Sequence, residues 1–323
     1  MKIRNLFIFT ALCTAGIVNA QTDAAGTAAT VGTLPTAPAK AATSDTVWFK
    51  GATFNLNLNQ TALSNWAGGG SNSVAVNGLV SMHANYAKGL SKWDNTLDLA
   101  YGLSKIGDAG DFVKTDDRIE LNSKYGRKLK GDWYYGGLLN FRTQFNLGYN
   151  AGDNINYISR FMAPGYLTLA LGFDYKPNEN FSFFIAPIAY KLTVVADTLL
   201  SDIGAYGVDS GSTTRSEIGG YVRLMYQKKL MENIDFKTKV DAFSNYQTNP
   251  QNIDITWETL LTMKVNKYIS ASLSTMLVYD DDIDIIVQNA EVPTIENPLG
   301  TPAVAGPRVQ FKEVLNIGFS YIF

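Results

Sequence analysis

Cysteine and histidine are almost absent from this sequence, with one of each among 323 residues. Cys13 lies within the first twenty residues, so the remainder has no disulfides, no thiol chemistry and no Cys-rich metal site. A basic excess is also missing, because 27 basic side chains face 29 acidic ones, and this argues against a nucleic-acid partner. Beyond the N-terminus no apolar run approaches the ~20 residues that a transmembrane helix needs.

The N-terminus carries the pattern of an export signal. Lys2 and Arg4 precede an apolar stretch at residues 6–18, and the small Ala20 follows it. This pattern predicts a secretory signal peptide over residues 1–20, which is cleaved on export. Residues 21–46 are rich in Ala, Thr, Gly and Pro, and they predict a flexible periplasmic leader because they offer little apolar surface to bury. Residues 47–323 then form the folded domain.

From residue 51 onward, apolar and polar residues alternate with a period of two, as in a β-strand with one apolar and one wet face. The first such segment sets Phe54, Leu56 and Leu58 against Asn55, Asn57 and Asn59. Twelve segments follow this pattern, and they start near residues 51, 74, 92, 116, 133, 165, 181, 215, 234, 253, 268 and 307. Most are much longer than the ~5–6 residues typical of strands in soluble proteins.

The connections between these segments alternate between short and long. Tight turns are predicted near residues 88–91, 130–132, 177–180, 231–233 and 266–267, whereas most of the other connections are long. In an outer-membrane barrel the strand count is even, the short turns lie at one end and the long loops lie at the other. The sequence therefore predicts an all-β fold, a twelve-stranded antiparallel transmembrane up-and-down β-barrel. An aromatic girdle is expected where Trp93, Trp133 and Phe181 begin strands just past tight turns.

Charged residues fall almost entirely on the polar, inward face of the predicted strands. On the outward face only Arg127 and Glu313 are charged, and both are expected near strand ends. An outward base at mid-bilayer would cost about 2–4 kcal/mol. The candidate lumen-facing charges are Asp94, Asp98, Arg142, Arg223, Lys237, Lys239, Glu258, Lys264 and Lys312.

Four stretches carry a family resemblance, namely residues 63–70 (LSNWAGGG), 93–102 (WDNTLDLAYG), 249–254 (NPQNID) and 306–313 (GPRVQFKE). They resemble the domain-of-unknown-function family 3078 of Bacteroidetes-type Gram-negative bacteria, over roughly residues 47–323. The resemblance implies an outer-membrane location, with outer-membrane lipid around the barrel, and it implies no activity. The last strand, ending at Phe323, also resembles the terminal strand that the barrel-assembly machinery recognises.

Candidate sites for chemistry are few. His83 is the only histidine and shares a strand face with Ser81, so a serine hydrolase would have to use this pair. Asp280, Asp282 and Asp284 would project from one face at the end of a strand and are weak candidate ligands for Ca²⁺. No catalytic residue and no cofactor are otherwise predicted.

The lumen is the best indication of function. Asp94 and Asp98 are expected to face Lys237 and Lys239 across the barrel, either as a field that orients polar solutes or as pairs that fill the interior. Loop 148–163 is expected either to fold into the mouth, as a constriction or a ligand platform, or to form a packed cap. The favoured function is a narrow pore or transporter for small polar solutes. The alternatives are a structural or partner-docking barrel of the cell envelope and, last, a membrane-embedded lipid hydrolase.

Overall fold

The computed structural model describes residues 47–62, 71–107, 111–149, 153, 155–266, 268–282, 284–288 and 304–322. The predicted signal peptide and leader lie outside the described residues, and so does Phe323. Among the residues that are described, no helix is long and apolar enough to cross a membrane.

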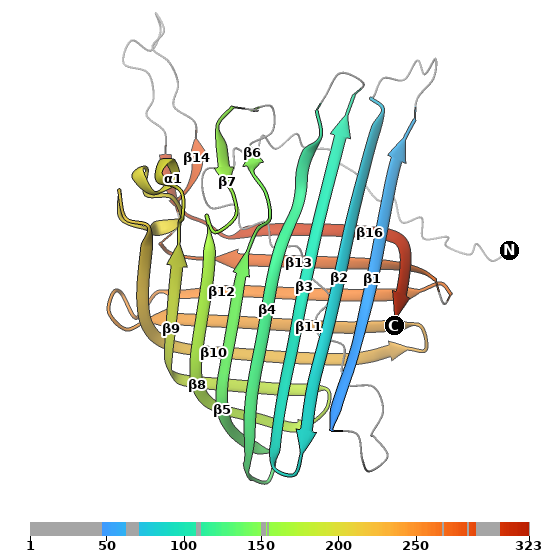
Figure 1. The fold of residues 1–323 in the computed structure, drawn as a ribbon, viewed down its shortest axis with the longest axis vertical. Helices are drawn as coiled ribbons and strands as arrows, with labels where there is room; N and C mark the ends of the chain where they lie inside the picture. Colours follow the sequence, from blue (N-terminus) through green and yellow to red (C-terminus); the bar gives the residue numbers. More distant parts are fainter. Residues whose placement is uncertain are drawn as a thin grey trace, which may run out of the picture.

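The described chain forms one closed barrel of twelve antiparallel strands (Figure 1). Barrel strands that follow each other in the sequence are neighbours, and β1 pairs with β16 to close the barrel. This confirms the predicted twelve-stranded up-and-down topology. The barrel strands are β1 (Trp48–Thr61), β2 (Ser73–Lys88), β3 (Ser91–Ile106), β4 (Val113–Lys130), β5 (Trp133–Thr143), β8 (Gly165–Asn178), β9 (Phe181–Val194), β10 (Thr214–Met231), β11 (Ile234–Asn245), β12 (Ile253–Lys264), β13 (Ile269–Tyr279) and β16 (Gln310–Ile322).

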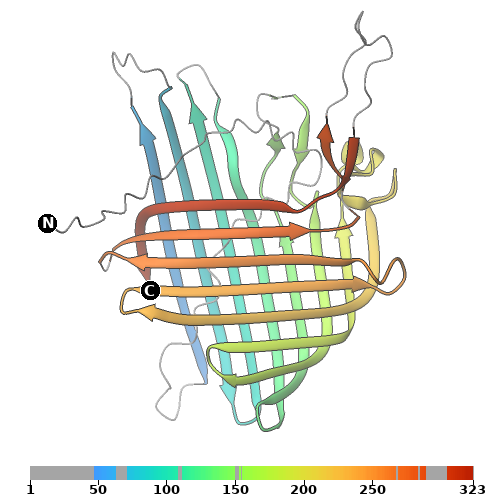
Figure 2. The same ribbon diagram turned by 180° about the vertical axis from the view of Figure 1, so that it is seen from behind.

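Short elements decorate the long connections. They are β6 (Gly148–Tyr149) with β7 (Tyr157–Ser159), α1 (Thr198–Asp202) with η1 (Ala205–Gly207), and β14 (Asp284–Gln288) with β15 (Val304–Pro307). All of them lie at one end of the barrel, and the short turns lie at the other (Figures 1 and 2). Gly89 and Gly131 occupy two of the short turns with φ of 58°, a conformation that glycine adopts without steric cost.

The two faces of the wall differ as the sequence predicts. Large apolar side chains cover the outside, and Leu171, Ile188 and Leu315 each expose more than 60% of their surface. Charged side chains are buried inside, where Arg118 and Glu217 each expose only 2%. A soluble protein would show the opposite arrangement, so this wall is built to face hydrocarbon.

Aromatic residues gather on the outer wall at the short-turn end. Trp48 packs against Trp93 with ring centroids 5.9 Å apart, and Trp133 packs against Tyr175 at 5.0 Å. The Phe181 ring packs edge-on against the Tyr175 ring, with centroids 6.5 Å apart. Trp93, Trp133 and Phe181 thus occupy the predicted girdle, which marks the depth of a membrane–water interface.

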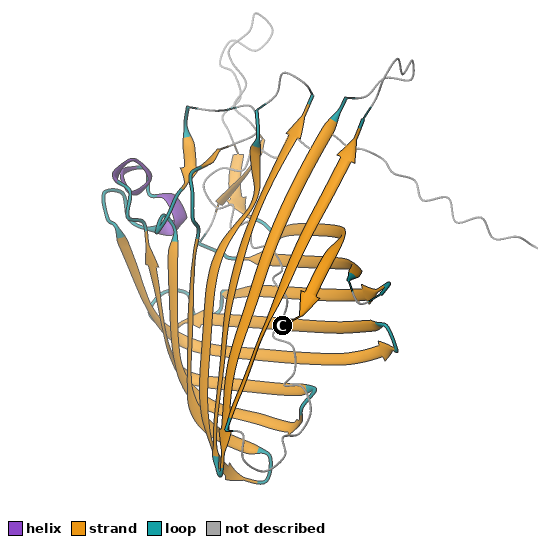
Figure 3. Ribbon diagram, turned by 45° about the vertical axis from the view of Figure 1, so that its right-hand side comes forward, coloured by secondary structure: helices purple, strands orange, loops and turns teal. Residues whose placement is uncertain are grey.

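Glycines allow the wall to bend sharply (Figure 3). A Cβ atom on Gly136 would lie 1.9 Å from the backbone oxygen of Tyr125. On Gly172 and Gly219 it would lie 2.0 Å from a backbone oxygen of the neighbouring strand. No other residue fits where strands approach this closely, so these glycines are required for barrel curvature.

The barrel closes over a short seam. β1 pairs with β16 through Thr53–Asn57 and Gly318–Ile322, five residues on each side. All other neighbouring barrel strands are in register over at least ten residues, as between β12 and β13. Figure 1 shows β16 bending towards β1 just before the C-terminus.

Candidate functional site

Charged side chains from opposite walls meet in the middle of the lumen. The Lys239 ammonium of β11 lies 2.8 Å from Glu258 of neighbouring β12 and 3.8 Å from Glu120 of β4. The strand order places β11 and β4 five positions apart among twelve, so the second contact crosses the barrel. All three side chains are at least nine-tenths buried, so little room for water remains around them.

A second contact crosses the lumen beside the first. Arg223 of β10 donates two hydrogen bonds to the Asp241 carboxylate, at 2.6 and 3.0 Å. Its Nη1 donates to the Asn122 side chain of β4 at 3.1 Å, four strand positions away. Glu120 accepts hydrogen bonds from Asn122 and Asn140 at 3.1 and 3.0 Å and pairs with Arg118 at 3.2 Å. We call this group the central network: Asp98, Arg118, Glu120, Asn122, Asn140, Arg223, Lys239, Asp241 and Glu258.

Two smaller networks lie above and below the central one. Towards the long loops, Lys191 contacts Asp254 at 2.8 Å, and it lies 3.7 Å from both Glu217 and Asp280. Arg215 pairs with Glu217 at 2.9 Å and donates a hydrogen bond to the Gly207 carbonyl of η1. Towards the short turns, the ion pairs are Lys124–Asp174 at 2.9 Å, Lys176–Asp94 at 2.9 Å and Lys176–Asp174 at 3.4 Å.

Four of the predicted lumen charges, Asp98, Arg223, Lys239 and Glu258, belong to the central network, and Asp94 belongs to the lower one. The other four lie elsewhere on the inner wall. Arg142 stacks over the Tyr166 ring, 5.2 Å from its centroid, and Lys312 lies 3.5 Å from the Thr115 carbonyl. Lys264 pairs with Asp235 at 3.0 Å near the short-turn rim, where half of the Lys264 side chain is exposed.

The predicted opposition of β3 and β11 agrees with the strand order, which places them six positions apart. Asp98 lies within electrostatic reach of both Lys239 and Lys237, and it accepts a hydrogen bond from Ser81 at 2.5 Å. Asp94 is engaged by Lys176 of β8 instead. Asp94 and Lys239 therefore form ion pairs with other partners rather than facing each other as members of two opposed rows.

Lys191 was missed by the sequence reasoning because β9 changes its inward parity. Phe184 and Ala186 are buried at even positions, whereas Ala189 is buried at an odd position. The register between β8 and β9 shifts next to Pro187, which cannot donate a hydrogen bond to the ladder. This proline within a strand was the signal that could have revealed the bulge.

The candidate Ca²⁺ ligands are engaged in ion pairs. Asp280 lies 3.7 Å from the Lys191 ammonium, and Asp282 lies 3.3 Å from the Arg215 guanidinium. The side chain of Asp284 lies outside the described residues. No group of three metal-ligating side chains occurs within the described part of the chain.

His83 faces the lumen near the short-turn end, and its imidazole covers Gly51, where an added Cβ would lie 2.5 Å from the ring. The neighbouring Ser81 hydroxyl donates its hydrogen bond to Asp98. A nucleophilic serine would have to donate that hydrogen bond to the histidine. The local geometry is that of a polar lining residue.

The described residues of loop 148–163 pack into a cap with the loop that carries α1 and η1. Their shared core consists of Ala163, Val195, Leu200, Ala205, Tyr206 and Val208, with Tyr157 packed against it. Asp197 accepts hydrogen bonds from the Leu200 N–H, the Tyr157 hydroxyl and Arg160, at 2.8–3.0 Å. Burial acts to raise the pKa of Asp197, but these hydrogen bonds outweigh it and hold the pKa below its usual value. The packed-cap alternative therefore holds for the described residues of this loop.

Comparison of the sequence with protein-family models found a match to one family. The family model described as "Protein of unknown function (DUF3078)" matches residues 58–149. The predicted family resemblance is confirmed over this stretch. The quoted motifs at 63–70 and 93–102 fall within it, whereas those at 249–254 and 306–313 lie beyond it. The comparison with curated proteins found no match.

Solved barrels resemble this chain only distantly. An outer-membrane channel from Pseudomonas putida F1 is 12% identical, covers 88% of this chain and 100% of its own, and has a TM-score of 0.37. The NanC porin is 9% identical, with coverages of 83% and 98% and a TM-score of 0.34. The toluene transporter TodX of P. putida is 9% identical, with coverages of 87% and 91% and a TM-score of 0.31. None of these similarities is strong enough to bear on function.

Proposed function

We propose that this chain is an outer-membrane barrel of a Gram-negative bacterium that acts as a narrow, normally closed pore or transporter for small polar solutes. The observation that supports this most is the central network, in which Lys239 and Glu120 meet across the lumen. Buried ion pairs seldom stabilise a fold more than apolar packing of the same volume does. Their retention in the lumen is therefore better explained by a polar path than by stability.

Outer-membrane location is supported by the apolar exterior and the aromatic girdle. Phe319 and Tyr321 alternate on the outside of β16, which fits delivery by the barrel-assembly machinery through the last strand. Export by a cleaved signal peptide at residues 1–20 is part of this proposal. Cell fractionation tests it, with N-terminal sequencing of the mature protein, which should begin at Gln21.

Conductance across planar bilayers tests the pore. We expect brief openings of low conductance from the wild-type protein, and a several-fold larger conductance from the Lys239→Ala/Glu120→Ala variant. The matched control is Lys264→Ala/Asp235→Ala, which removes an ion pair from the rim rather than from the constriction. If all three proteins fold but pass no current, the pore is refuted.

The second candidate is a structural or partner-docking barrel without transport. It is favoured by the same closure of the central lumen, together with the packed cap over the long-loop end. We do not propose an enzyme, because the Ser81 hydroxyl donates its hydrogen bond to Asp98 and so does not form the hydrolase pair with His83. Any lipid hydrolysis that persisted in the His83→Ala variant would exclude a histidine-based site altogether.

A further inference from the structure

Basic side chains are concentrated on one side of the short-turn end. Six of them are exposed at the ends of four neighbouring strands, β1 to β4, and we call this group the basic rim: Lys50, Lys88, Lys92, Arg127, Lys128 and Lys130. Within the described residues of the same strand ends and turns, Asp132 is the only exposed acidic residue. Asp94, which is also close by, faces inward and is paired with Lys176. The exposed charge of this region is therefore strongly positive.

Among the described residues, the other side of the same end is closer to balance. There the ends of β8 to β13 expose Lys228, Lys229 and Lys264 together with Glu179 and Glu232. Lys264 is also paired with Asp235. Positive charge is thus a property of the basic rim and not of the whole circumference.

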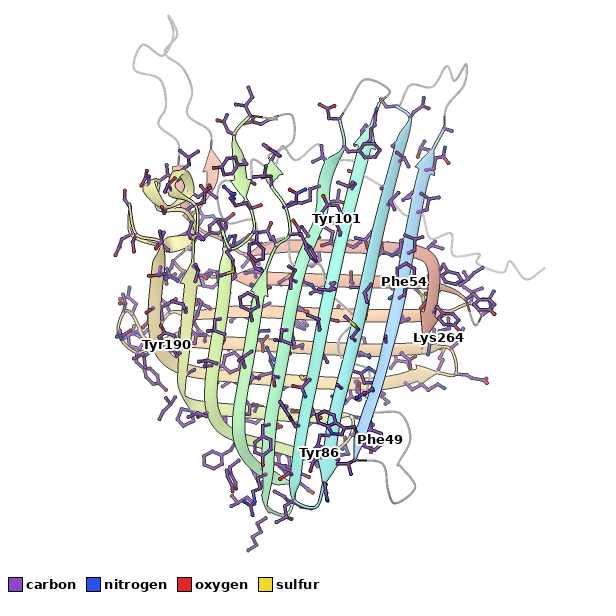
Figure 4. The ribbon with its side chains drawn as sticks, viewed as in Figure 1. Phe49, Phe54, Tyr86, Tyr101, Tyr190 and Lys264 are labelled. Carbon is purple, nitrogen blue, oxygen red and sulfur yellow. The ribbon has the colours of Figure 1, made fainter. Side chains whose placement is uncertain are left out.

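The basic rim lies at the depth of the aromatic girdle. Arg127 is in register with the outward Tyr135, and Lys130 is in register with Trp133. The Lys50 ammonium lies 6.0 Å from the centroid of the Trp48 ring. Tyr86, the partner of Trp48 in the ladder, lies near the lower end of the barrel in Figure 4. Aromatic girdles sit at the headgroup level of a bilayer, so the long side chains of Lys50, Arg127 and Lys130 reach the phosphates. The Lys92 ammonium lies instead 5.3 Å from the centroid of the buried Tyr134 ring.

We propose that the basic rim binds the phosphate groups of anionic phospholipids in the leaflet at the short-turn end, which is the periplasmic one in outer-membrane barrels. This inference rests on the membrane location proposed above. Lysine and arginine near an anionic lipid surface are each attracted to it, and the planar guanidinium of Arg127 can donate two parallel hydrogen bonds to one phosphate. A one-sided rim would give the barrel a preferred lipid-contacting side.

Quenching by brominated lipids tests this directly, because Trp48, Trp93 and Trp133 lie in the girdle beside the basic rim. Protein is reconstituted into phosphatidylcholine vesicles that contain brominated phosphatidylglycerol or brominated phosphatidylcholine, and tryptophan fluorescence gives the relative affinity of the two lipids. The wild-type protein should prefer phosphatidylglycerol several-fold at low salt, and high salt should remove the preference. The Arg127→Gln/Lys130→Gln variant should lose most of the preference.

The control Lys105→Gln/Arg308→Gln removes two charges near the long-loop end and should keep the preference. An equal preference in all three proteins, or an equal loss in the control, would overturn the inference. A wild-type preference that does not respond to salt would also overturn it, and this result requires no variant to fold. Binding to purified cell-wall sacculi that is lost in the rim variant, with lipid preference unchanged, would assign the basic rim to another partner. Absence of quenching by either lipid would refute the membrane location instead.

Discussion

Replacing Lys239 with methionine tests whether the middle of the lumen is filled. The Lys239 ammonium lies 2.8 Å from Glu258, 3.8 Å from Glu120 and 3.9 Å from Asp241. At an effective dielectric constant of about 20, the closest pair alone has a gross attraction of about 6 kcal/mol, much of which offsets desolvation. Methionine keeps the length of the side chain but leaves two buried glutamates without this cation. We expect the free energy of unfolding to fall by about 3–5 kcal/mol.

Equilibrium unfolding in urea, followed by tryptophan fluorescence in lipid vesicles, measures this loss. The Lys239→Met/Glu258→Gln double variant removes both partners of the closest pair, and it should recover part of the lost stability. A double-mutant cycle of the two changes should give a coupling free energy of about 0.5–3 kcal/mol. A loss below about 1 kcal/mol in Lys239→Met would mean that water reaches this site, since exposed ion pairs contribute that little. The filled lumen would then be wrong.

Three further predictions concern the wall and the cap. Gly136→Ala should prevent folding or cost about 3 kcal/mol or more, because its Cβ would meet the Tyr125 carbonyl. The control Gly137→Ala should cost about 1 kcal/mol, because its Cβ would lie 3.2 Å from the Leu171 side chain. Heat-modified gel mobility and urea midpoints compare the two variants, and equal effects would contradict the packing. Asp197→Ala should expose the cap to proteolysis with a loss of about 1–2 kcal/mol, and unchanged cleavage would contradict its capping role. Because the pKa of Asp197 is lowered in the folded cap, the contribution of Asp197 to cap stability should be complete above about pH 4 and should fall as the pH drops through the folded pKa. If protection of the cap from proteolysis already weakens between pH 7 and 5, another group is responsible.

Much of the barrel could be predicted because the two faces of its wall meet different environments. Hydrocarbon outside and a polar lumen inside impose a strict period of two, and all twelve strands begin within three residues of the predicted positions. β1, for example, begins at Trp48 rather than residue 51, and β16 begins at Gln310 rather than 307. The short β6 and β14 were not predicted, since elements of two to five residues carry too little periodicity.

The partners inside the lumen could not be predicted from the same pattern. Periodicity tells that Asp94 faces inward, but which cation it meets depends on the stagger of strands around the cylinder. Its partner proved to be Lys176, on a strand three positions away in the barrel and 82 residues away in the sequence. Lys191 was lost for a different reason, since one irregular step at Pro187 reverses the parity of every residue after it.

The short seam between β1 and β16 has a consequence for biogenesis. Eleven of the twelve strand interfaces join barrel strands that follow each other in the sequence, so hairpins can be added one after another to a growing open sheet. The twelfth joins the two margins of that sheet through five residues on each side. Closure of the cylinder therefore needs only a short stretch of backbone to pair, between Thr53–Asn57 of β1 and Gly318–Ile322 of β16.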